Sequence, residues 1–212
     1  MRLLPGILAM TLIVVASNVL VQFLLLDGLL TWGAFTLPFA FLVTEIMNRV
    51  YGTQAARRVV LVGFITGIIC SLIGTQIMLE FGPAVTLRVA CGSAAGFLAA
   101  QLTDIAVFNR LRAHSWWKAP LVASLVGAVV DTVIFFALSF SAALSPLFPA
   151  DAVEATAWAQ DAAPLLTFGP EMPMWVSLAL ADMGIKVIIA LVALLPFRLI
   201  IARIFAARPA NV

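Results

Sequence analysis

The amino-acid sequence predicts an all-α integral membrane protein with six transmembrane helices, forming a single domain over residues 1–212. Its residues are 64% hydrophobic and only 10% charged, whereas soluble proteins carry about 25% charged residues. The mean hydropathy is +1.14. Apolar runs also recur along the chain at roughly the length of about 20 residues that a helix needs to cross the hydrocarbon core of a bilayer.

Six apolar windows define the predicted spans, at about residues 3–26, 31–48, 59–79, 86–108, 119–144 and 174–196. The first window continues to Leu26, which is longer than the apolar core of a signal peptide, so we interpret it as a retained span. The second is short, and it ends where Glu45 and Asn48 interrupt the apolar run. Between the fifth and sixth spans lies a long acidic connection, residues 147–173, which contains no Lys or Arg.

The cations predict the orientation of these spans. Of the Lys and Arg residues outside the spans, Arg88 alone falls in a loop on the side of the acidic connection. The others fall on the opposite side of the membrane: Arg2, Arg49, Arg57, Arg58, Arg110, Arg112, Lys118, Arg198, Arg203 and Arg208. Because cytoplasmic loops carry the excess of Lys and Arg, both termini are expected in the cytoplasm and the acidic connection outside. This pattern predicts a multi-pass membrane protein.

Polar side chains within the spans are the candidate functional residues, because they are costly in lipid and normally face a partner or a cavity. They come mostly in pairs one helical turn apart, which places both members on one face of a helix. The set comprises Asn18 and Gln22, Glu45 and Asn48, Gln101 and Asp104, Asp131, and Asp182 and Lys186. Such a set predicts a bundle with a polar interior.

Structural roles remain open for several of these residues. Asp182 and Lys186 are spaced to form an intrahelical ion pair, and Lys186 lies at a depth that would also allow a pair with Asp131. Glu45 and Asp104 lie near the cytoplasmic face, where they could instead neutralise Arg49 and Arg110. Asn18 and Gln22 could simply hydrogen-bond neighbouring helices.

Enzyme chemistry is poorly supported by the sequence. It contains no Gly-x-Ser-x-Gly motif and no phosphate-binding glycine loop with a lysine, and its one histidine, His114, falls in a basic loop. An aspartyl dyad of Asp104 and Asp131 is the weaker alternative. We therefore expect no enzyme, no metal and no cofactor. A carrier for a small flat molecule fits better, with Phe41 and Phe135 available to stack on the ligand.

Three motifs carry a resemblance to a known family: Pro38-x-x-Phe-Leu-x-Thr-Glu45-Ile-x-Asn48-x-x-Tyr51-Gly52-x-x-x-Ala56-Arg57-Arg58, Gln101-Leu-Thr-Asp104-Ile-x-Val-Phe108-x-x-Leu-Arg112, and Asp131-Thr-x-Ile-Phe135. Together they resemble the VUT family, the queuosine-precursor transporters. The resemblance implies a six-helix inner-membrane bundle akin to the substrate-binding components of ECF vitamin transporters. It also implies import of 7-cyano-7-deazaguanine, 7-aminomethyl-7-deazaguanine or queuine.

The sequence departs from the family pattern at two positions. Glu45 stands where the family usually has Asp, and Arg49 stands where it has an acid, so Arg49 is placed to pair with Glu45. A carboxylate can accept the N1–H and amine edge of a guanine-like base, and we expect Asp131 or Asp104 to do so. The expected substrate-binding set is Asp131, Asp104, Glu45, Asn48, Gln101, Asn18, Gln22, Lys186, Phe41 and Phe135.

The expected partners are a deazapurine substrate and the lipid bilayer, with protons as a candidate coupling ion and no nucleic acid. Repeated small residues, Gly92 and Gly96 among them, favour close helix packing within the chain over a homo-oligomer interface. The alternative function is that of a substrate-capturing subunit of an ECF-type transporter, or a non-transporting membrane scaffold. Facilitated and proton-coupled transport both stay open.

Overall fold

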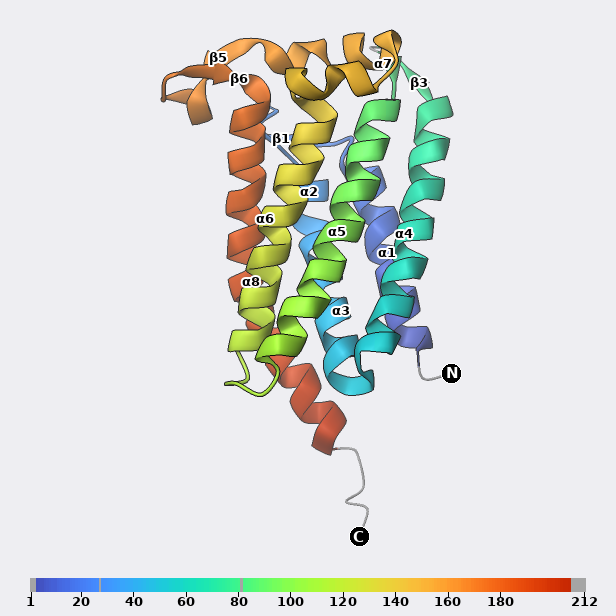
Figure 1. The fold of residues 1–212 in the computed structure, drawn as a ribbon, viewed down its shortest axis with the longest axis vertical. Helices are drawn as coiled ribbons and strands as arrows, with labels where there is room; N and C mark the ends of the chain where they lie inside the picture. Colours follow the sequence, from blue (N-terminus) through green and yellow to red (C-terminus); the bar gives the residue numbers. More distant parts are fainter. Residues whose placement is uncertain (1–2, 27, 81, 207–212) are drawn as a thin grey trace.

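The computed structural model describes residues 3–26, 28–80 and 82–206, and long helices running along one axis dominate it (Figure 1). The helices that build the bundle are α1 (Leu4–Leu20), α2 (Gly33–Thr36), α3 (Pro38–Tyr51), α4 (Thr53–Gln76), α5 (Leu87–Leu111), α6 (Lys118–Phe140) and α8 (Met174–Ala206). The start of α1 and the end of α8 lie at the same end of the bundle, the lower end in Figure 1.

Short elements cover the upper end of the bundle in Figure 1. Three antiparallel two-stranded pairs connect helices: β1 (Leu24–Leu25) with β2 (Leu30–Thr31), β3 (Met78–Leu79) with β4 (Gly82–Pro83), and β5 (Ala162–Pro164) with β6 (Glu171–Pro173). The short helix η1 (Ala142–Leu147) leads into the acidic connection, which also contains α7 (Ala150–Glu154), η2 (Ala157–Gln160) and η3 (Leu165–Thr167). This connection is therefore an ordered cap over the helix ends.

Four of the described helices, α4, α5, α6 and α8, are long and apolar enough to cross a membrane. The apolar helix α1 has 17 residues and ends at Leu20, short of the Leu26 expected from hydropathy, because the chain turns there into the β1–β2 hairpin. The predicted second span is divided between α2 and α3. Pro38 has no N–H to donate to the preceding turn, so the helical hydrogen bonding is interrupted at that point. The fold is all-α, and the count of six spans stays a prediction.

Two other helix ends differ from the expected spans. Helix α4 begins at Thr53, before Arg57 and Arg58, because Gly52 alone separates it from α3. Gly52 has φ +87°, a backbone conformation that side chains beyond glycine rarely adopt. Helix α8 continues through Pro196 to Ala206 instead of ending near residue 196; helices in membranes tolerate an internal proline where neighbours satisfy the freed carbonyl.

Helices α5 and α6 approach each other through the repeated small residues, Gly96 among them, that the sequence analysis predicts to favour close helix packing. A Cβ added to Gly96 would lie 2.9 Å from Asp131 Oδ1 and 3.3 Å from Phe135 Cβ. The lower half of the bundle packs through apolar clusters in which Val59 and Ile105 join α4 to α5, and Phe108 and Phe197 join α5 to α8. The glycine thus lets α5 sit directly against the backbone turn that carries Asp131.

Arg88, predicted to lie beside the acidic connection, is buried and forms no ion pair with an acid among the described residues. Its guanidinium donates to the carbonyl oxygens of Leu138 (2.8 Å) and Ser141, and to the hydroxyl groups of Ser145 (3.3 Å) and Thr156 (3.4 Å). Because these groups belong to the end of α6 and to the cap, Arg88 fastens the cap to the start of α5.

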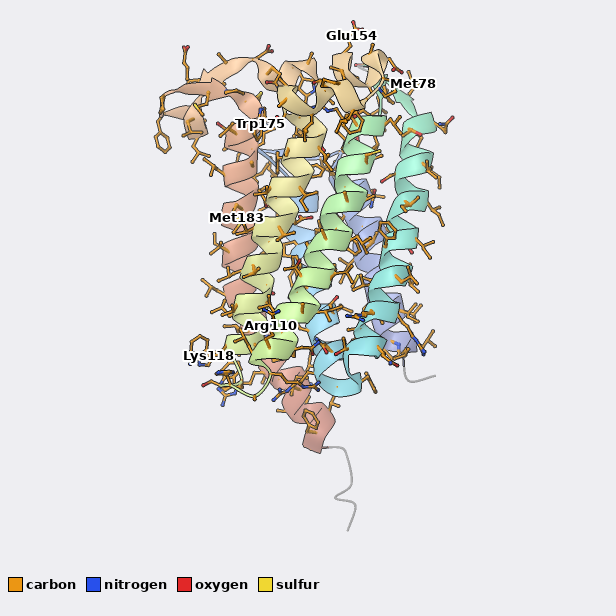
Figure 2. All side chains as sticks on the ribbon, viewed as in Figure 1. Met78, Arg110, Lys118, Glu154, Trp175 and Met183 are labelled. Atoms are coloured by element: carbon orange, nitrogen blue, oxygen red, sulfur yellow. The ribbon has the colours of Figure 1, made fainter. Side chains whose placement is uncertain are left out.

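Charge is distributed unevenly along the bundle axis. Figure 2 shows Arg110 and Lys118 at the lower end, and Glu154 at the upper end. This arrangement agrees with the charge asymmetry on which the predicted orientation rests.

Replacing Gly96 with Leu should destabilise the protein by about 1–3 kcal/mol or prevent its folding, since the new side chain would overlap Asp131 and Phe135. Thermal unfolding of the detergent-solubilised protein measures the effect. The matched control is Ala95→Leu on the adjacent, exposed position of the same helix. Equal stability of the two variants would contradict the close α5–α6 contact.

Candidate functional site

A cavity of about 340 Å³ lies in the half of the bundle beneath the cap. Its walls come from α1, the β1–β2 hairpin, α2, α4, α5, α6 and α8, with one residue of η2, Trp158, at the outer end. The volume is in the range of small-molecule sites, which are mostly apolar clefts with a few placed polar groups. This cavity is the candidate functional site.

One lysine joins two carboxylates in the wall of the cavity. Lys186 Nζ lies 2.7 Å from Asp131 Oδ2 on α6 and also contacts Asp182 Oδ2 one turn away on its own helix. It also donates to the Thr132 hydroxyl at 3.1 Å, and that hydroxyl lies 3.1 Å from Asp182 Oδ2. Both ion pairs suggested by the sequence therefore form, and they form together.

This cluster leaves acceptor capacity on two residues of the cavity wall. The three donors of the ammonium group are all engaged, by Asp131, Thr132 and Asp182. Within the described part of the chain, Oδ1 of Asp131 and Oδ1 of Asp182 accept no hydrogen bond. Two carboxylates and one ammonium carry a net charge of −1, so the cluster suits a ligand that presents hydrogen-bond donors.

Aromatic rings form the outer part of the same cavity. Phe135, Phe136 and Phe140 belong to α6, and Trp158 comes from the cap. The Phe135 and Phe136 rings meet edge to face with centroids 4.9 Å apart, and the Phe140 and Trp158 centroids are 5.8 Å apart. Aromatic faces of this kind can stack on a flat ligand. On the opposite wall, Asn18 donates one amide N–H to the Val14 carbonyl at 2.9 Å and keeps its second.

A second buried polar cluster, here called the inner cluster, lies nearer the lower end of the bundle. It comprises Thr44, Glu45, Asn48, Gln101, Asp104 and Ser124, all at most 7% exposed. The Thr44 hydroxyl donates to Gln101 Oε1 at 2.6 Å, and the Ser124 hydroxyl donates to Glu45 Oε1 at 2.7 Å. These bonds join α3 to α5 and to α6, with no lining residue in common with the cavity.

The expected pairing of Arg49 with Glu45 is wrong. Arg49 donates to the Arg112 carbonyl at 2.8 Å, and Arg112 donates back to the Arg49 carbonyl at 3.0 Å. The cause is geometric: Glu45 points into the bundle toward Ser124, whereas Arg49, one turn later, reaches the end of α5. Asp104 likewise forms no ion pair with Arg110, whose side chain is exposed.

The residues expected to bind substrate therefore divide into groups. Asn18, Asp131, Phe135 and Lys186 line the cavity. Glu45, Asn48, Gln101 and Asp104 belong to the inner cluster. Phe41 is buried between the two, with its ring against Gly127 of α6. Gln22 lies outside both, exposed, and donates to the Ala84 carbonyl at 3.1 Å.

Most lining residues were not in the expected substrate-binding set, and Asp182 and Trp158 are the two that bear most on the chemistry of the cavity. Asp182 was among the polar candidates within the spans but not in the expected substrate-binding set, although its i, i+4 spacing placed it on the same face as Lys186. Trp158 lies in the acidic connection, and nothing in the sequence around it predicts that it lines the cavity. Its position in the cavity wall depends on how the cap folds back over the bundle. The described residues contain no group of three His, Cys, Asp or Glu side chains that could hold a metal ion.

Comparison with known proteins assigns the family. Residues 31–201 match the family model described as "Putative vitamin uptake transporter". The chain belongs to this family. It is therefore a transporter and not an enzyme, and its apolar helices make it a multi-pass membrane protein.

Two relatives of this transporter carry more specific names. The chain is 32% identical over 199 residues to the "Queuosine precursor transporter" of Escherichia coli (strain K12), covering 87% of this chain and 79% of the relative. It is 33% identical over 142 residues to the "Probable queuosine precursor transporter" of Haemophilus influenzae, covering 61% of this chain and 57% of the relative. No solved structure matches the transporter.

Replacing Lys186 with Met should destabilise the transporter by about 3–5 kcal/mol, because Asp131 and Asp182 would remain buried without a cation. Thermal unfolding in detergent measures the change. The triple variant Asp131→Asn/Asp182→Asn/Lys186→Met should recover most of the loss, and Lys118→Met, at an exposed lysine, should change stability by about 0.5 kcal/mol or less. A stable Lys186→Met protein would argue against charge pairing in the cavity wall.

Proposed function

We propose that this protein imports queuosine precursors across the bacterial inner membrane and binds their 7-deazaguanine ring in the cavity. The observation that carries the proposal is the acid–lysine–acid cluster of Asp131, Lys186 and Asp182 under an aromatic wall. The names of the two relatives supply the substrate class.

The chemistry of the ring matches the free acceptors. A guanine-like edge presents N1–H and an exocyclic amine side by side, and a carboxylate can accept both. Asp182 Oδ1 and Asp131 Oδ1 are the free carboxylate oxygens on the cavity wall. In the proposed complex Lys186 orients these carboxylates without touching the base, since its three donors are already used.

The other edge and the faces of the ring find partners on the remaining walls. The second amide N–H of Asn18 can donate to the ring carbonyl. Phe135 and Phe140 offer apolar surface to the ring faces. A ring that lacks the N7 acceptor of guanine needs no donor at that position, which suits an aromatic wall.

The finer topology forms part of the same proposal. Helix α1 and the interrupted pair α2–α3 would complete six crossings together with α4, α5, α6 and α8, with cytoplasmic termini. The cap and the cavity beneath it would then face the outside, where the substrate is captured. Protons are the proposed coupling ion, and the carboxylates inside the bundle supply the groups that could carry them.

The import test uses a bacterial strain that can neither make nor import the base, and the queuosine content of its tRNA is the measurement. Wild-type protein should restore queuosine when 7-cyano-7-deazaguanine, 7-aminomethyl-7-deazaguanine or queuine is supplied at low concentration. Asp182→Asn and Asp131→Asn should each lose at least tenfold in uptake, since a charge-assisted acceptor pair is worth about 1.5–3 kcal/mol. Asn keeps the size of the side chain, so the fold is retained.

Asp151→Asn is the matched control, because Asp151 is an exposed acid of the cap. No restoration by wild-type protein that is present in the membrane would overturn the proposal of import by this chain alone. Restoration only after an energising ATPase module is added would make the chain a substrate-capturing subunit.

The orientation predicts the reactivity of introduced cysteines toward a membrane-impermeant maleimide. In a Cys70→Ser/Cys91→Ser background, Glu154→Cys in the cap should be labelled in intact spheroplasts. His114→Cys, in the basic connection between α5 and α6, should be labelled only after the membrane is permeabilised. The reverse pattern would place the termini outside.

A further inference from the structure

The inner cluster contains two carboxyl groups in contact, and neither has a cation beside it. Glu45 and Asp104 are 2% and 0% exposed, and their carboxyl groups lie close enough to interact with each other. The two ion pairs formed by the described residues both lie in the cavity wall, around Lys186. The charge of Glu45 and Asp104 is therefore not offset by a lysine, as the charges of Asp131 and Asp182 are.

A hydrogen bond between two carboxyl groups requires a proton on one of them, because an ionised carboxylate only accepts. Two negative charges at contact in an apolar interior are also unfavourable, so such pairs share one proton. The burial of Glu45 beside Asp104 therefore favours a carboxyl pair that holds one proton.

Among the described residues, the groups packed around the pair include no cation that pairs with either carboxyl group. Helix α6 contributes the Ser124 hydroxyl, which already donates to Glu45 Oε1. The neighbouring parts of α4 and α8 are apolar, with Val59 and Val60 on one and Ala193 and Phe197 on the other. The charged groups at the lower rim, Arg49 on α3 and Arg112 after α5, donate to main-chain carbonyls, and Arg110 is exposed.

An independent observation shows that the inner cluster is incomplete in this conformation. Asn48 is 0% exposed, and both polar atoms of its amide lack a hydrogen-bond partner among the described residues. Both Asp104 oxygens likewise lack a hydrogen-bond partner among the described residues. Buried polar groups are normally satisfied, and Asn48 lies one turn from Glu45 on the same face of α3. Its amide N–H groups can therefore donate a hydrogen bond to a nearby carboxylate.

We propose that Glu45 and Asp104 form a proton-binding site that couples proton movement to transport. In the conformation described, the pair holds one proton between its oxygens. When the lower end of the bundle opens, that proton passes to water on the cytoplasmic side and leaves two carboxylates. Asn48 then donates its free N–H to the new charge.

The placement of the pair suits this role. Ser124, which contacts Glu45, precedes Asp131 by seven residues on α6, and two helical turns correspond to about 10 Å. The Phe41 ring lies against Gly127 between these levels. The reciprocal bonds between Arg49 and Arg112 join the ends of α3 and α5 below the pair. The proton site therefore lies between the cavity and the cytoplasmic end, and is sealed from both.

A first experiment does not depend on the substrate. Infrared spectra of the purified protein at neutral pH should contain the carbonyl band of a protonated buried carboxyl group, with a shift in D₂O. The double variant Glu45→Gln/Asp104→Asn should lose this band, and Glu154→Gln, an exposed acid of the cap, should keep it. A wild-type spectrum without the band, or a double variant that retains it in full, would overturn the proton site.

A second experiment rests on the proposed function, and it separates coupling from binding. Proteoliposomes with a clamped membrane potential take up labelled 7-cyano-7-deazaguanine under an acid-outside pH gradient, and substrate exchange is measured without a gradient. Glu45→Gln mimics the protonated acid, so this variant should keep exchange and lose the response to the gradient. Glu154→Gln should keep both.

The other possible results of this experiment would each overturn a different part of the proposal. A Glu45→Gln protein that still accumulates substrate with the pH gradient overturns the proton site, as does wild-type uptake driven only by sodium. Loss of both exchange and substrate affinity in a folded Glu45→Gln protein would assign Glu45 to substrate contact instead. If wild-type protein exchanges no deazaguanine, the proposed substrate fails, and the infrared result alone decides the proton site.

Discussion

The structure depends on how charge is accommodated in the interior of an apolar bundle. Lys186 must find both Asp131 and Asp182, because either carboxylate left alone in this environment would cost several kcal/mol. Asp182 lies on the same helix as Lys186, whereas Asp131 lies on α6, so meeting both fixes the rotation of α6 against α8. That rotation in turn points Phe135 and Phe136 toward the cavity. One cluster of charges thus sets both the helix packing and the polarity of the site.

Close backbone approach is the second constraint. Gly96 brings α5 against the turn of α6 that carries Asp131, so the carboxylate is held between the α5 backbone on one side and Lys186 on the other. Without hydrophobic driving force between helices in lipid, such packing contacts and interhelical hydrogen bonds supply much of the association. The Thr44–Gln101 and Ser124–Glu45 bonds serve the same purpose in the inner cluster. Polar groups there stabilise the bundle and remain available for function.

Hydropathy could predict the helical class of the fold, because a chain in lipid must satisfy its backbone within helices. It could not place the ends of α1 or the break before Pro38, since hydrogen bonds at single residues decide these. The i, i+3 and i, i+4 spacings correctly placed Glu45 with Asn48 and Asp182 with Lys186 on shared faces. The spacing of residues within one helix does not determine how that helix is rotated against its neighbours. This rotation brings Glu45 to Ser124 and not to Arg49. Trp158 reached the cavity only through the fold of the cap.

The two polar layers of the bundle differ in what neutralises them, and this difference suggests a division of labour. In the cavity wall a covalently fixed cation, Lys186, offsets one of the two acid charges, so the charge of the wall would stay constant while the proposed neutral base binds and leaves. Among the described residues no cation pairs with Glu45 or Asp104, so in the proposed site a proton balances this pair, and its charge would change whenever the cluster meets water. Opening toward the cytoplasm removes the apolar surroundings that favour the protonated pair. In the proposed site, opening of the bundle would therefore favour release of the proton. This link would need no direct contact between the substrate and the proton.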